Sequence, residues 1–367
     1  MLRVGEEYMK RIEDIDKNFA SQVVQYEGMK VYDVQEAPFK TYGLMQPNSG
    51  RFERMPQQIA DKVNVSVQQL NSNTSGGRIR FKTDSEQIIV SAVLPTVCHF
   101  PHMPLTGTSC FDLYADGEYV NVFRPEFFDK NKDESERYDA TIFFGERKMR
   151  DIMIHFPLYN EVRDVLVALK ADATVLAGET YEFKKPIVFY GSSITQGGCA
   201  SHPGNCYPAI ISRRLNCDYI NLGFSAGCFG EQTMAEYIGG LEMGALVYDY
   251  DHNAGDIALL EATHEACFCT IREKRPDVPI VIVSAADKFL GLQQEDRWNI
   301  IRRTYDNAIK NGDKNVYLVD GREIYKEVGV DLCTVDSIHP NDLGFWCMAN
   351  KIGEVVKRIL KHEEITE

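Results

Sequence analysis

The second half of the chain alternates short apolar runs with stretches of helical length. The apolar runs fall at residues 187–190, 218–222, 245–250, 279–284 and 316–320. Helical patterns lie between and after them, at 207–215, around 232–238, at about 257–274, at 297–310 and near 345–359. Strands that alternate with helices predict a parallel sheet with right-handed crossovers. We therefore expect a flavodoxin-like, three-layer α/β domain over residues 181–367.

The first of these runs ends in a turn of small residues, Gly191-Ser192-Ser193-Ile194-Thr195. Gly191 relieves crowding where the chain leaves the strand, so a small side chain can stand at the carboxyl end of the sheet. Ligands bind at this edge in open α/β sheets. Ser193 is therefore a candidate nucleophile, although serines at such a turn could also serve only to cap the next helix.

Far downstream, Asp336 and His339 stand three residues apart, just before the last amphipathic stretch. A hydroxyl is a weak nucleophile until a base removes its proton, and the base works best when a third group orients it. One short loop could supply both groups to Ser193. The alternative is that His339 is a helix-cap residue beside Pro340.

These motifs resemble those of the GDSL-type, or SGNH, serine hydrolases, most closely their two-domain bacterial members. The segments at 191–195, 221–227, 249–254 and 336–339 match the four sequence blocks of that family in the same order. The resemblance implies a catalytic triad in which Ser193 is the nucleophile, His339 the general base and Asp336 its orienting partner. No Cys/His cluster has the spacing of a zinc site, so we predict neither a metal nor a cofactor.

The resemblance also implies an oxyanion hole. Its donors would be the backbone N–H of Ser193, a backbone N–H of the second block and the side-chain amide of Asn253. The glycine of the second block falls at Ala226 or Gly227, depending on alignment, and the sequence leaves this choice open. The third block reads Asp251-His252-Asn253-Ala254 where the family usually has Gly-x-Asn-Asp. Asp251 could orient Asn253 or His252, or cap the following helix.

Residues 31–180 show short alternating runs broken by turn residues, which predict an all-β sandwich or jelly-roll domain. Asp116-Gly117 reads as a two-residue hairpin turn. Residues 1–30 are expected to form an N-terminal extension, and the domain boundary should fall between Thr180 and Lys185. Phe111-Asp112-Leu113-Tyr114 and the segment 155–160 resemble the N-terminal sandwich of the two-domain members.

The loop at 98–104 carries two prolines, two histidines and a phenylalanine. This composition suits a fixed wall with polar tips, so His99 and His102 are candidates for contact with the acyl acceptor. An ordinary rigid crossover between strands is an equally good interpretation.

Composition excludes several function classes. A net charge of −14 argues against a nucleic-acid partner, which would need a basic face. No apolar stretch reaches the roughly twenty residues of a membrane span. Early acidic residues and the absence of an apolar leader predict a cytoplasmic protein. The ten scattered cysteines are then expected to be reduced thiols.

By resemblance, the expected activity is a serine-dependent carboxylester hydrolase that removes short acyl groups, with acetyl esters of a carbohydrate as the leading case. The substrate would be a small-molecule or oligosaccharide ester. Alternatives are an acyltransferase with the same triad, a catalytically inactive carbohydrate-binding relative, and a phosphate-binding module using residues 191–198. The last alternative lacks a P-loop lysine and leaves Asp336 and His339 unexplained. The acyl group, the alcohol and the oligomeric state stay open.

Overall fold

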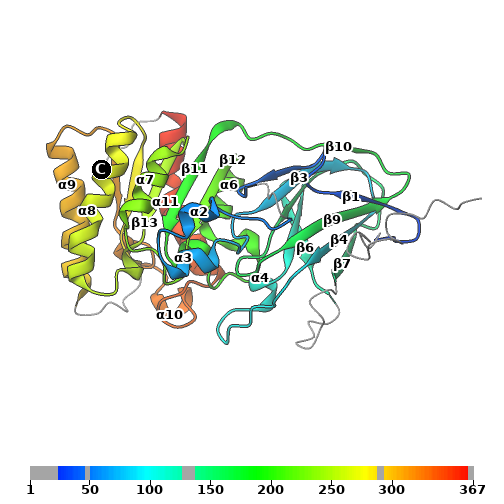
Figure 1. The fold of residues 1–367 in the computed structure, drawn as a ribbon, viewed down its shortest axis with the longest axis horizontal. Coiled ribbons are helices and arrows are strands. Elements are labelled where there is room, and N and C mark those ends of the chain that lie inside the picture. The colour runs from blue at the N-terminus through cyan, green and yellow to red at the C-terminus, as the bar shows by residue number, and fades with distance from the viewer. Residues whose placement is uncertain (1–23, 46–49, 126–136, 287–292, 363–367) are drawn as a thin grey trace, which may run out of the picture.

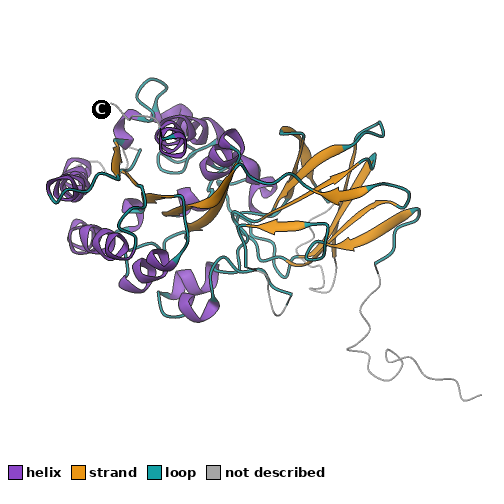
Figure 2. Cartoon of the chain, turned by 90° about the horizontal axis from the view of Figure 1, so that it is seen from above, coloured by secondary structure: helices purple, strands orange, loops and turns teal. Residues whose placement is uncertain are grey.

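The computed structural model describes residues 24–45, 50–125, 137–286 and 293–362 (Figure 1). An antiparallel β part at one end adjoins an α/β part at the other (Figures 1 and 2). The expected fold class is confirmed, since a five-stranded parallel sheet follows two antiparallel sheets. The predicted N-terminal extension lies largely outside the described residues, and the first described strand begins at Met29.

The β part contains a four-stranded and a six-stranded sheet in which every neighbouring pair is antiparallel. The four-stranded sheet has the order β1-β9-β4-β7, spanning Met29–Asp33, Arg163–Lys170, Gln87–Val93 and Arg137–Phe143. The other sheet has the order β10-β3-β8-β5-β6, spanning Val175–Ala177, Arg78–Thr83, Arg150–His155, Phe111–Ala115 and Glu118–Phe123. Strand β2, Lys40–Tyr42, pairs with β3.

The core of the β part lies between these sheets. Alternate residues of a strand face the same side, and accordingly Ile88, Val90 and Ala92 of β4 are buried in one cluster with Ile152 and Ile154 of β8. The predicted hairpin at 116–117 joins β5 to β6. Both of its residues have the left-handed backbone that a two-residue hairpin turn requires, with φ of 53° and 85°. The jelly-roll topology stays a prediction.

Three short helices in the β part were not expected from the alternating pattern: α2 at Gln57–Ala60, α3 at Val65–Leu70 and α4 at Leu105–Thr108. Asn64 caps α3 by accepting a hydrogen bond from the N–H of Val67. Ala60 and Val67 are fully buried in a cluster with Phe224 of the α/β part. Helices α2 and α3 therefore attach the β part to the α/β part.

The α/β sheet has the order β12-β11-β13-β14-β15 with all strands parallel. In that order the strands span Cys217–Gly223, Phe183–Gly191, Ala245–Asp249, Ile280–Val283 and Val316–Val319. The helices are α5 Ser193–Gln196, α6 Tyr207–Leu215, α7 Gln232–Gly240, α8 Ile257–Lys274, α9 Gln294–Lys310, α10 Val330–Cys333 and α11 Asp342–Lys361. The predicted bounds of α6 and α8 agree with the structure, whereas α9 begins three residues earlier than expected.

Helices cover both faces of the sheet (Figure 2). Ile187 and Phe189 of β11 pack in one cluster with residues of α6 and α11. Val188 and Tyr190 of the same strand belong to the opposite cluster, with residues of α7, α8 and α9. All four side chains are fully buried, which explains why β11 reads as a continuous apolar run.

The candidate residues follow the carboxyl ends of different strands. Ser193 follows β11, Ala226 follows β12, Asn253 follows β13, and Asp336 and His339 come after β15. The strand order reverses beside β11, because β12 lies on one side of it and β13 on the other. Crevices at such a reversal are the usual ligand sites of open α/β sheets.

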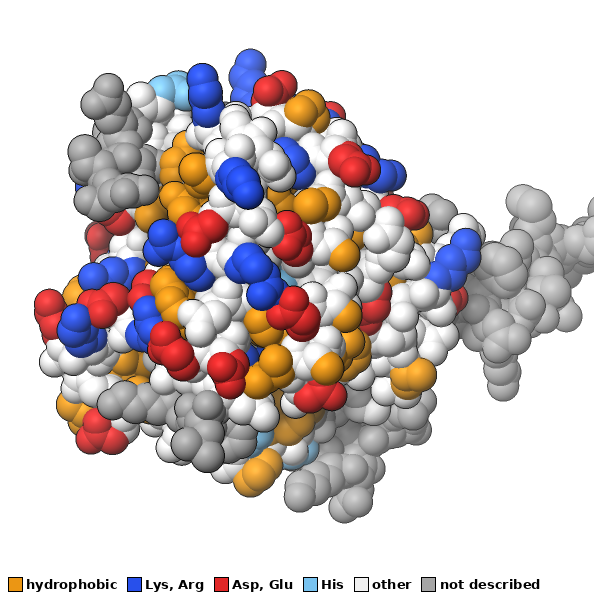
Figure 3. Space-filling view, turned by 90° about the vertical axis from the view of Figure 1, so that its left-hand side faces the viewer, with side chains coloured by type: hydrophobic (Ala, Val, Ile, Leu, Met, Phe, Trp, Pro, Cys, Tyr) orange, Lys and Arg blue, Asp and Glu red, His pale blue; other side chains and the backbone are white. Residues whose placement is uncertain are grey.

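The outer face of α8 and α9 carries acidic and basic side chains in a mixed pattern (Figure 3). Arg303 of α9 pairs with Glu261 of α8 there. Among the described helices, none has the length and hydropathy needed to cross a membrane. All ten cysteines lie in described segments and are unpaired.

Candidate active site

Gly191 creates the turn that presents Ser193. A Cβ atom at Gly191 would lie 2.0 Å from Thr195 Oγ1 and 2.3 Å from the carbonyl oxygen of Asp249, so no larger residue fits. Ser192 is buried, and its Oγ accepts a hydrogen bond of 3.2 Å from the N–H of Ile194. The following residue, Ser193, is the first of α5 and is only half-buried. Its hydroxyl therefore stands at the sheet edge.

Ser193, His339 and Asp336 form a continuous hydrogen-bonded chain. Ser193 Oγ lies 2.9 Å from His339 Nε2, and His339 Nδ1 lies 2.8 Å from Asp336 Oδ2. Residues 146 positions apart in the sequence thus meet across the site. A serine, an imidazole and a carboxylate in this order have the connectivity needed to remove the serine proton.

The loop from 334 to 340 brings Asp336 back onto His339. Ser337 has a left-handed backbone, with φ of 71°, and Thr334 pairs with Pro340 in an isolated antiparallel bridge. Asp336 Oδ1 accepts hydrogen bonds from the N–H groups of His339, at 2.7 Å, and Ile338, at 3.1 Å. Partial burial works to raise the pKa of Asp336, but these bonds and the imidazole outweigh it, and the pKa falls below its ordinary value.

The two candidate donors of the second sequence block, Ala226 and Gly227, differ in burial and in backbone conformation. Ala226 is exposed and has a left-handed backbone, with φ of 50°, the conformation that favours glycine. Gly227 is buried, and its N–H donates to the carbonyl oxygen of Phe224 at 3.0 Å. The N–H of Gly227 is therefore already used inside the turn, whereas Ala226 is exposed.

The third block forms a short 3-10 turn, Asp251–Asn253, after β13. Buried Asp251 accepts a hydrogen bond of 3.0 Å from the N–H of Ala285 and pairs with His252 at 3.3 Å. The acid therefore contacts His252, one of the partners left open by the sequence. Arg297 of α9, also buried, donates to the carbonyl oxygens of Asp251 and Ala254. This turn is thus held from several sides, and Asn253 is half-buried at its end.

Asp249 lies beneath the serine turn and was not singled out from the sequence. It is fully buried, and its Oδ2 accepts hydrogen bonds from Tyr207 Oη at 3.1 Å and Thr195 Oγ1 at 3.4 Å. Burial raises the pKa of Asp249 to about 7, against a smaller lowering by His252. Through Thr195 this carboxyl group holds α5 in place, and among the described residues its hydrogen bonds go to Thr195 and Tyr207, not to Ser193.

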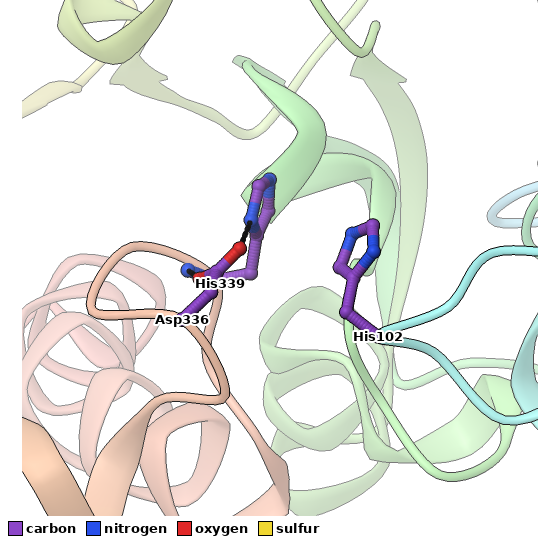
Figure 4. Close-up of side chains that lie close together, drawn as sticks. All are labelled: His102, Asp336 and His339. Carbon is purple, nitrogen blue, oxygen red and sulfur yellow. Dashed lines mark hydrogen bonds and ion pairs between the residues drawn. The ribbon is translucent and has the colours of Figure 1, made fainter.

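The β part contributes side chains to the same site. The ring of His102 faces that of His339 from a separate loop, with ring centroids 5.4 Å apart (Figure 4). Phe100 packs between His102 and Tyr159, and Tyr159 Oη donates to the backbone oxygen of Ser193 at 3.1 Å. His99 is exposed on the same loop. The contact of Tyr159 had no signal in the sequence, since it depends on how the two parts pack.

Two groups of side chains among the described residues could converge on a cation. His102, Asp336 and His339 form one, and Asp249, Asp251 and His252 form the other, each with donor atoms within 4.8 Å of one another. In both groups the carboxylates already pair with an imidazole or accept hydrogen bonds. The expectation of no metal stays a prediction.

Comparison with protein-family models matches both parts of the chain. Residues 184–357 match the GDSL-like lipase/acylhydrolase family. Residues 29–175 match the model for the N-terminus of SGNH-hydrolase-type esterases. Among curated proteins, none matches the sequence significantly.

Solved structures share the whole two-part architecture. A Bacteroides ovatus protein described as a GDSL-like lipase has 26% identity and a TM-score of 0.77, over 91% of this chain and 98% of its own. A salicylyl acyltransferase from a tetracycline biosynthetic pathway has 21% identity and a TM-score of 0.73, over 90% and 99%. An acetyl xylan esterase from the rumen bacterium Butyrivibrio proteoclasticus has 11% identity and a TM-score of 0.58, over 92% and 100%. The last two likenesses concern the fold.

Proposed function

Because the chain belongs to the GDSL-like lipase/acylhydrolase family and is an esterase or acylhydrolase, we propose that Ser193, His339 and Asp336 are its catalytic triad. The reaction is then a serine-dependent hydrolysis of carboxylic esters. One observation carries this proposal: the hydrogen-bonded chain from Ser193 Oγ through both ring nitrogens of His339 to Asp336.

In this mechanism His339 Nε2 accepts the Ser193 proton as Oγ attacks the acyl carbon. Asp336 holds the proton of Nδ1, so that Nε2 presents its lone pair, and it stabilises the imidazolium that forms. His339 then gives the proton to the departing alcohol, which leaves an acyl-serine. A water molecule, deprotonated by the same imidazole, releases the acid and restores Ser193.

The negative oxygen of the tetrahedral intermediate needs preorganised donors. We assign this role to the N–H of Ser193, the N–H of Ala226 and the side-chain amide of Asn253. Gly227 takes no part, because its N–H serves the turn at Phe224. The left-handed backbone and exposure of Ala226 support the choice of this residue over Gly227.

We expect Asn253→Ala to lower kcat about a hundredfold with little change in KM, because one such donor stabilises the transition state by about 3 kcal/mol. Steady-state hydrolysis of p-nitrophenyl acetate measures both constants. Asn307→Ala, which removes an amide on α9 that bonds Glu265, is the matched control. A rise in KM alone for Asn253→Ala would place Asn253 in ground-state binding and the oxyanion hole elsewhere.

The proposed substrates are short-chain esters, with acetyl groups on a carbohydrate as the leading case. The two-part architecture shared with an acetyl xylan esterase supports this choice as an analogy of fold. The direct test is a series of p-nitrophenyl esters of increasing chain length, followed by acetate release from acetylated oligosaccharides. Hydrolysis rates that fall steeply for acyl chains longer than acetyl support the proposal. Faster hydrolysis of the long-chain esters contradicts it.

Acyl transfer is the second candidate, because the architecture is shared over its full length with a salicylyl acyltransferase. The same acyl-serine would pass its acyl group to an acceptor alcohol in place of water. Adding a polyol acceptor during turnover separates the two activities. An acyltransferase forms the new ester in excess of free acid, whereas a hydrolase releases acid at an unchanged rate.

The loop at 98–104 is proposed to border the acyl-acceptor side of the site. His102 lies beside His339, the residue that returns the proton to the alcohol, and Phe100 braces it against Tyr159. An exposed imidazole in this position can donate a hydrogen bond to a sugar hydroxyl.

We expect His102→Ala to lower kcat/KM for an acetylated sugar about tenfold while changing that for p-nitrophenyl acetate less than twofold, since one hydrogen bond is lost only with the larger alcohol. Parallel assays of the two substrates give the ratio. His362→Ala, which removes an exposed imidazole at the end of α11, is the matched control. Equal effects on both substrates would exclude a contact with the acceptor.

A further inference from the structure

Asp112 lies at the contact between the β part and the α/β part. Its carboxylate is fully buried. Oδ1 lies 2.7 Å from Nδ1 of His155, and Oδ2 lies 2.6 Å from both Nδ1 of His202 and the backbone nitrogen of Gly204. Burial works to raise the pKa of Asp112, but the two imidazoles outweigh it and keep the pKa below its ordinary value. A charged carboxylate therefore joins three donors from two parts of the chain.

The histidines stand on opposite sides of this junction. His155 belongs to β8, in the same sheet as Asp112. His202 and Gly204 belong to residues 199–205 of the α/β part, which we call the bridge segment. Tyr119 of β6 stacks on His202, with ring centroids 4.5 Å apart and planes inclined by 17°. The bridge segment is thus held by the β part through directed contacts.

The bridge segment also holds the loop that carries His339. The N–H of Cys199 donates to the carbonyl oxygen of Pro340, the residue after His339, at 2.8 Å. The N–H of Ser201 donates to Asp342 Oδ1 at 2.8 Å. On its other side, the carbonyl oxygen of Ser201 accepts a hydrogen bond of 2.6 Å from Thr106 Oγ1. Residues 199–205 therefore lie between the β part and the candidate general base.

We propose that Asp112 is a positioning residue for catalysis, which fixes His339 relative to Ser193 by holding the bridge segment. This inference rests on the proposed triad and gives a role to the Phe111–Tyr114 motif that the triad leaves unexplained. A carboxylate with three donors in a buried site gives strong and directional hydrogen bonds. Small displacements of a catalytic group lower the rate steeply, even when their cause is remote.

His202 and His155 provide a matched pair for the test, because each donates to one oxygen of the same buried carboxylate. Only His202 belongs to the bridge segment. We expect His202→Ala to lower kcat for p-nitrophenyl acetate about tenfold with KM changed less than twofold. His155→Ala removes a hydrogen bond within the β part and leaves the contacts of the bridge segment in place. It is therefore expected to leave kcat within a factor of two or three of wild type.

Rescue distinguishes positioning from general stability. The amide of His202→Asn can donate to Asp112 from the place of Nδ1, so this variant is expected to recover most of the wild-type kcat. Should His202→Ala fail to fold, His202→Gln replaces it. The longer side chain carries its amide past the place of Nδ1, so the bond to Asp112 is lost and the same tenfold fall in kcat is expected. All rates are measured at least 10 °C or so below each variant's melting temperature, so that unfolding does not enter.

The outcomes separate this inference from the triad itself. A larger fall in kcat for His202→Ala than for His155→Ala, with recovery in His202→Asn, supports positioning by Asp112. Equal values of kcat in the two alanine variants, or a change confined to KM, overturn it. Ser193→Ala is assayed in parallel: if it is inactive while His202→Ala keeps the wild-type kcat, the triad stands and only the positioning role fails.

Discussion

Replacing Ser193 by alanine is expected to abolish ester hydrolysis, with kcat for p-nitrophenyl acetate reduced by about 10⁵-fold or more. The substitution removes the proposed attacking oxygen, and among the described residues no other hydroxyl is hydrogen-bonded to His339 Nε2. The fold should persist, because the side chain of Ser193 is half-buried and its hydroxyl bonds only to this imidazole among the described contacts. His339→Ala is expected to cost a similar factor, since the groups of a triad act as a unit.

The neighbouring Ser192→Ala is the matched control for this experiment. Its hydroxyl caps α5 through the N–H of Ile194, so its loss should reduce the free energy of unfolding by about 1 kcal/mol while activity remains. Thermal melting of the three variants checks that the fold is retained. Wild-type hydrolysis by Ser193→Ala would exclude a serine mechanism at this residue.

The sequence predicted well what is determined locally. The apolar run before Gly191 and the turn after it identified a buried strand and a half-buried serine at its end, because strand burial and glycine at a close approach leave local signals. The bounds predicted for α6 and α8 agree with the structure, since Pro208 in the first turn of α6 and Pro276 just after α8 are local signals of a helix start and a helix end. The contact between Asp336 and His339 was likewise predictable. The two residues belong to one loop, where near neighbours in the sequence can meet without help from the rest of the fold.

What the sequence did not predict depends on backbone conformation or on packing between distant segments. The proposed choice of Ala226 over Gly227 rests on a left-handed backbone at Ala226, which an alanine in the sequence does not signal. The contact of Tyr159 with Ser193 and the junction of Asp112 with His202 exist only once the β part packs on the α/β part. The helix α3 was missed because its six residues are too few for a periodic pattern.

Packing between the two parts also bears on the role of the β part. Ser75 Oγ donates to the carbonyl oxygen of Gln196 at 2.6 Å, and Gln196 Nε2 donates to the carbonyl oxygen of Leu158 at 3.2 Å. The last residue of α5 is therefore fixed from the β part. Together with the contact of Tyr159, this places both ends of the serine-bearing helix under the control of residues that precede the parallel sheet.

Asp336→Asn is expected to lower kcat by about 10³- to 10⁴-fold although it changes a single atom. The asparagine oxygen can still accept the N–H groups of Ile338 and His339, as Asp336 Oδ1 does, so the loop should keep its shape. The amide nitrogen then faces Nδ1 of His339 and donates to it. The imidazole proton moves to Nε2, which points at Ser193 and can no longer accept the hydroxyl proton.

This tautomer argument gives a second measurement besides kcat. In Asp336→Asn, the rate at which a fluorophosphonate reagent modifies Ser193 should fall, relative to wild type, by about the same factor as kcat. Both reactions need the same proton acceptor. Asp331→Asn removes the same charge from an exposed position on α10 and is expected to react at the wild-type rate. An Asp336→Asn variant that keeps more than about a tenth of the wild-type kcat would show that Asp336 does not set the tautomer of His339, since that role predicts a far larger loss.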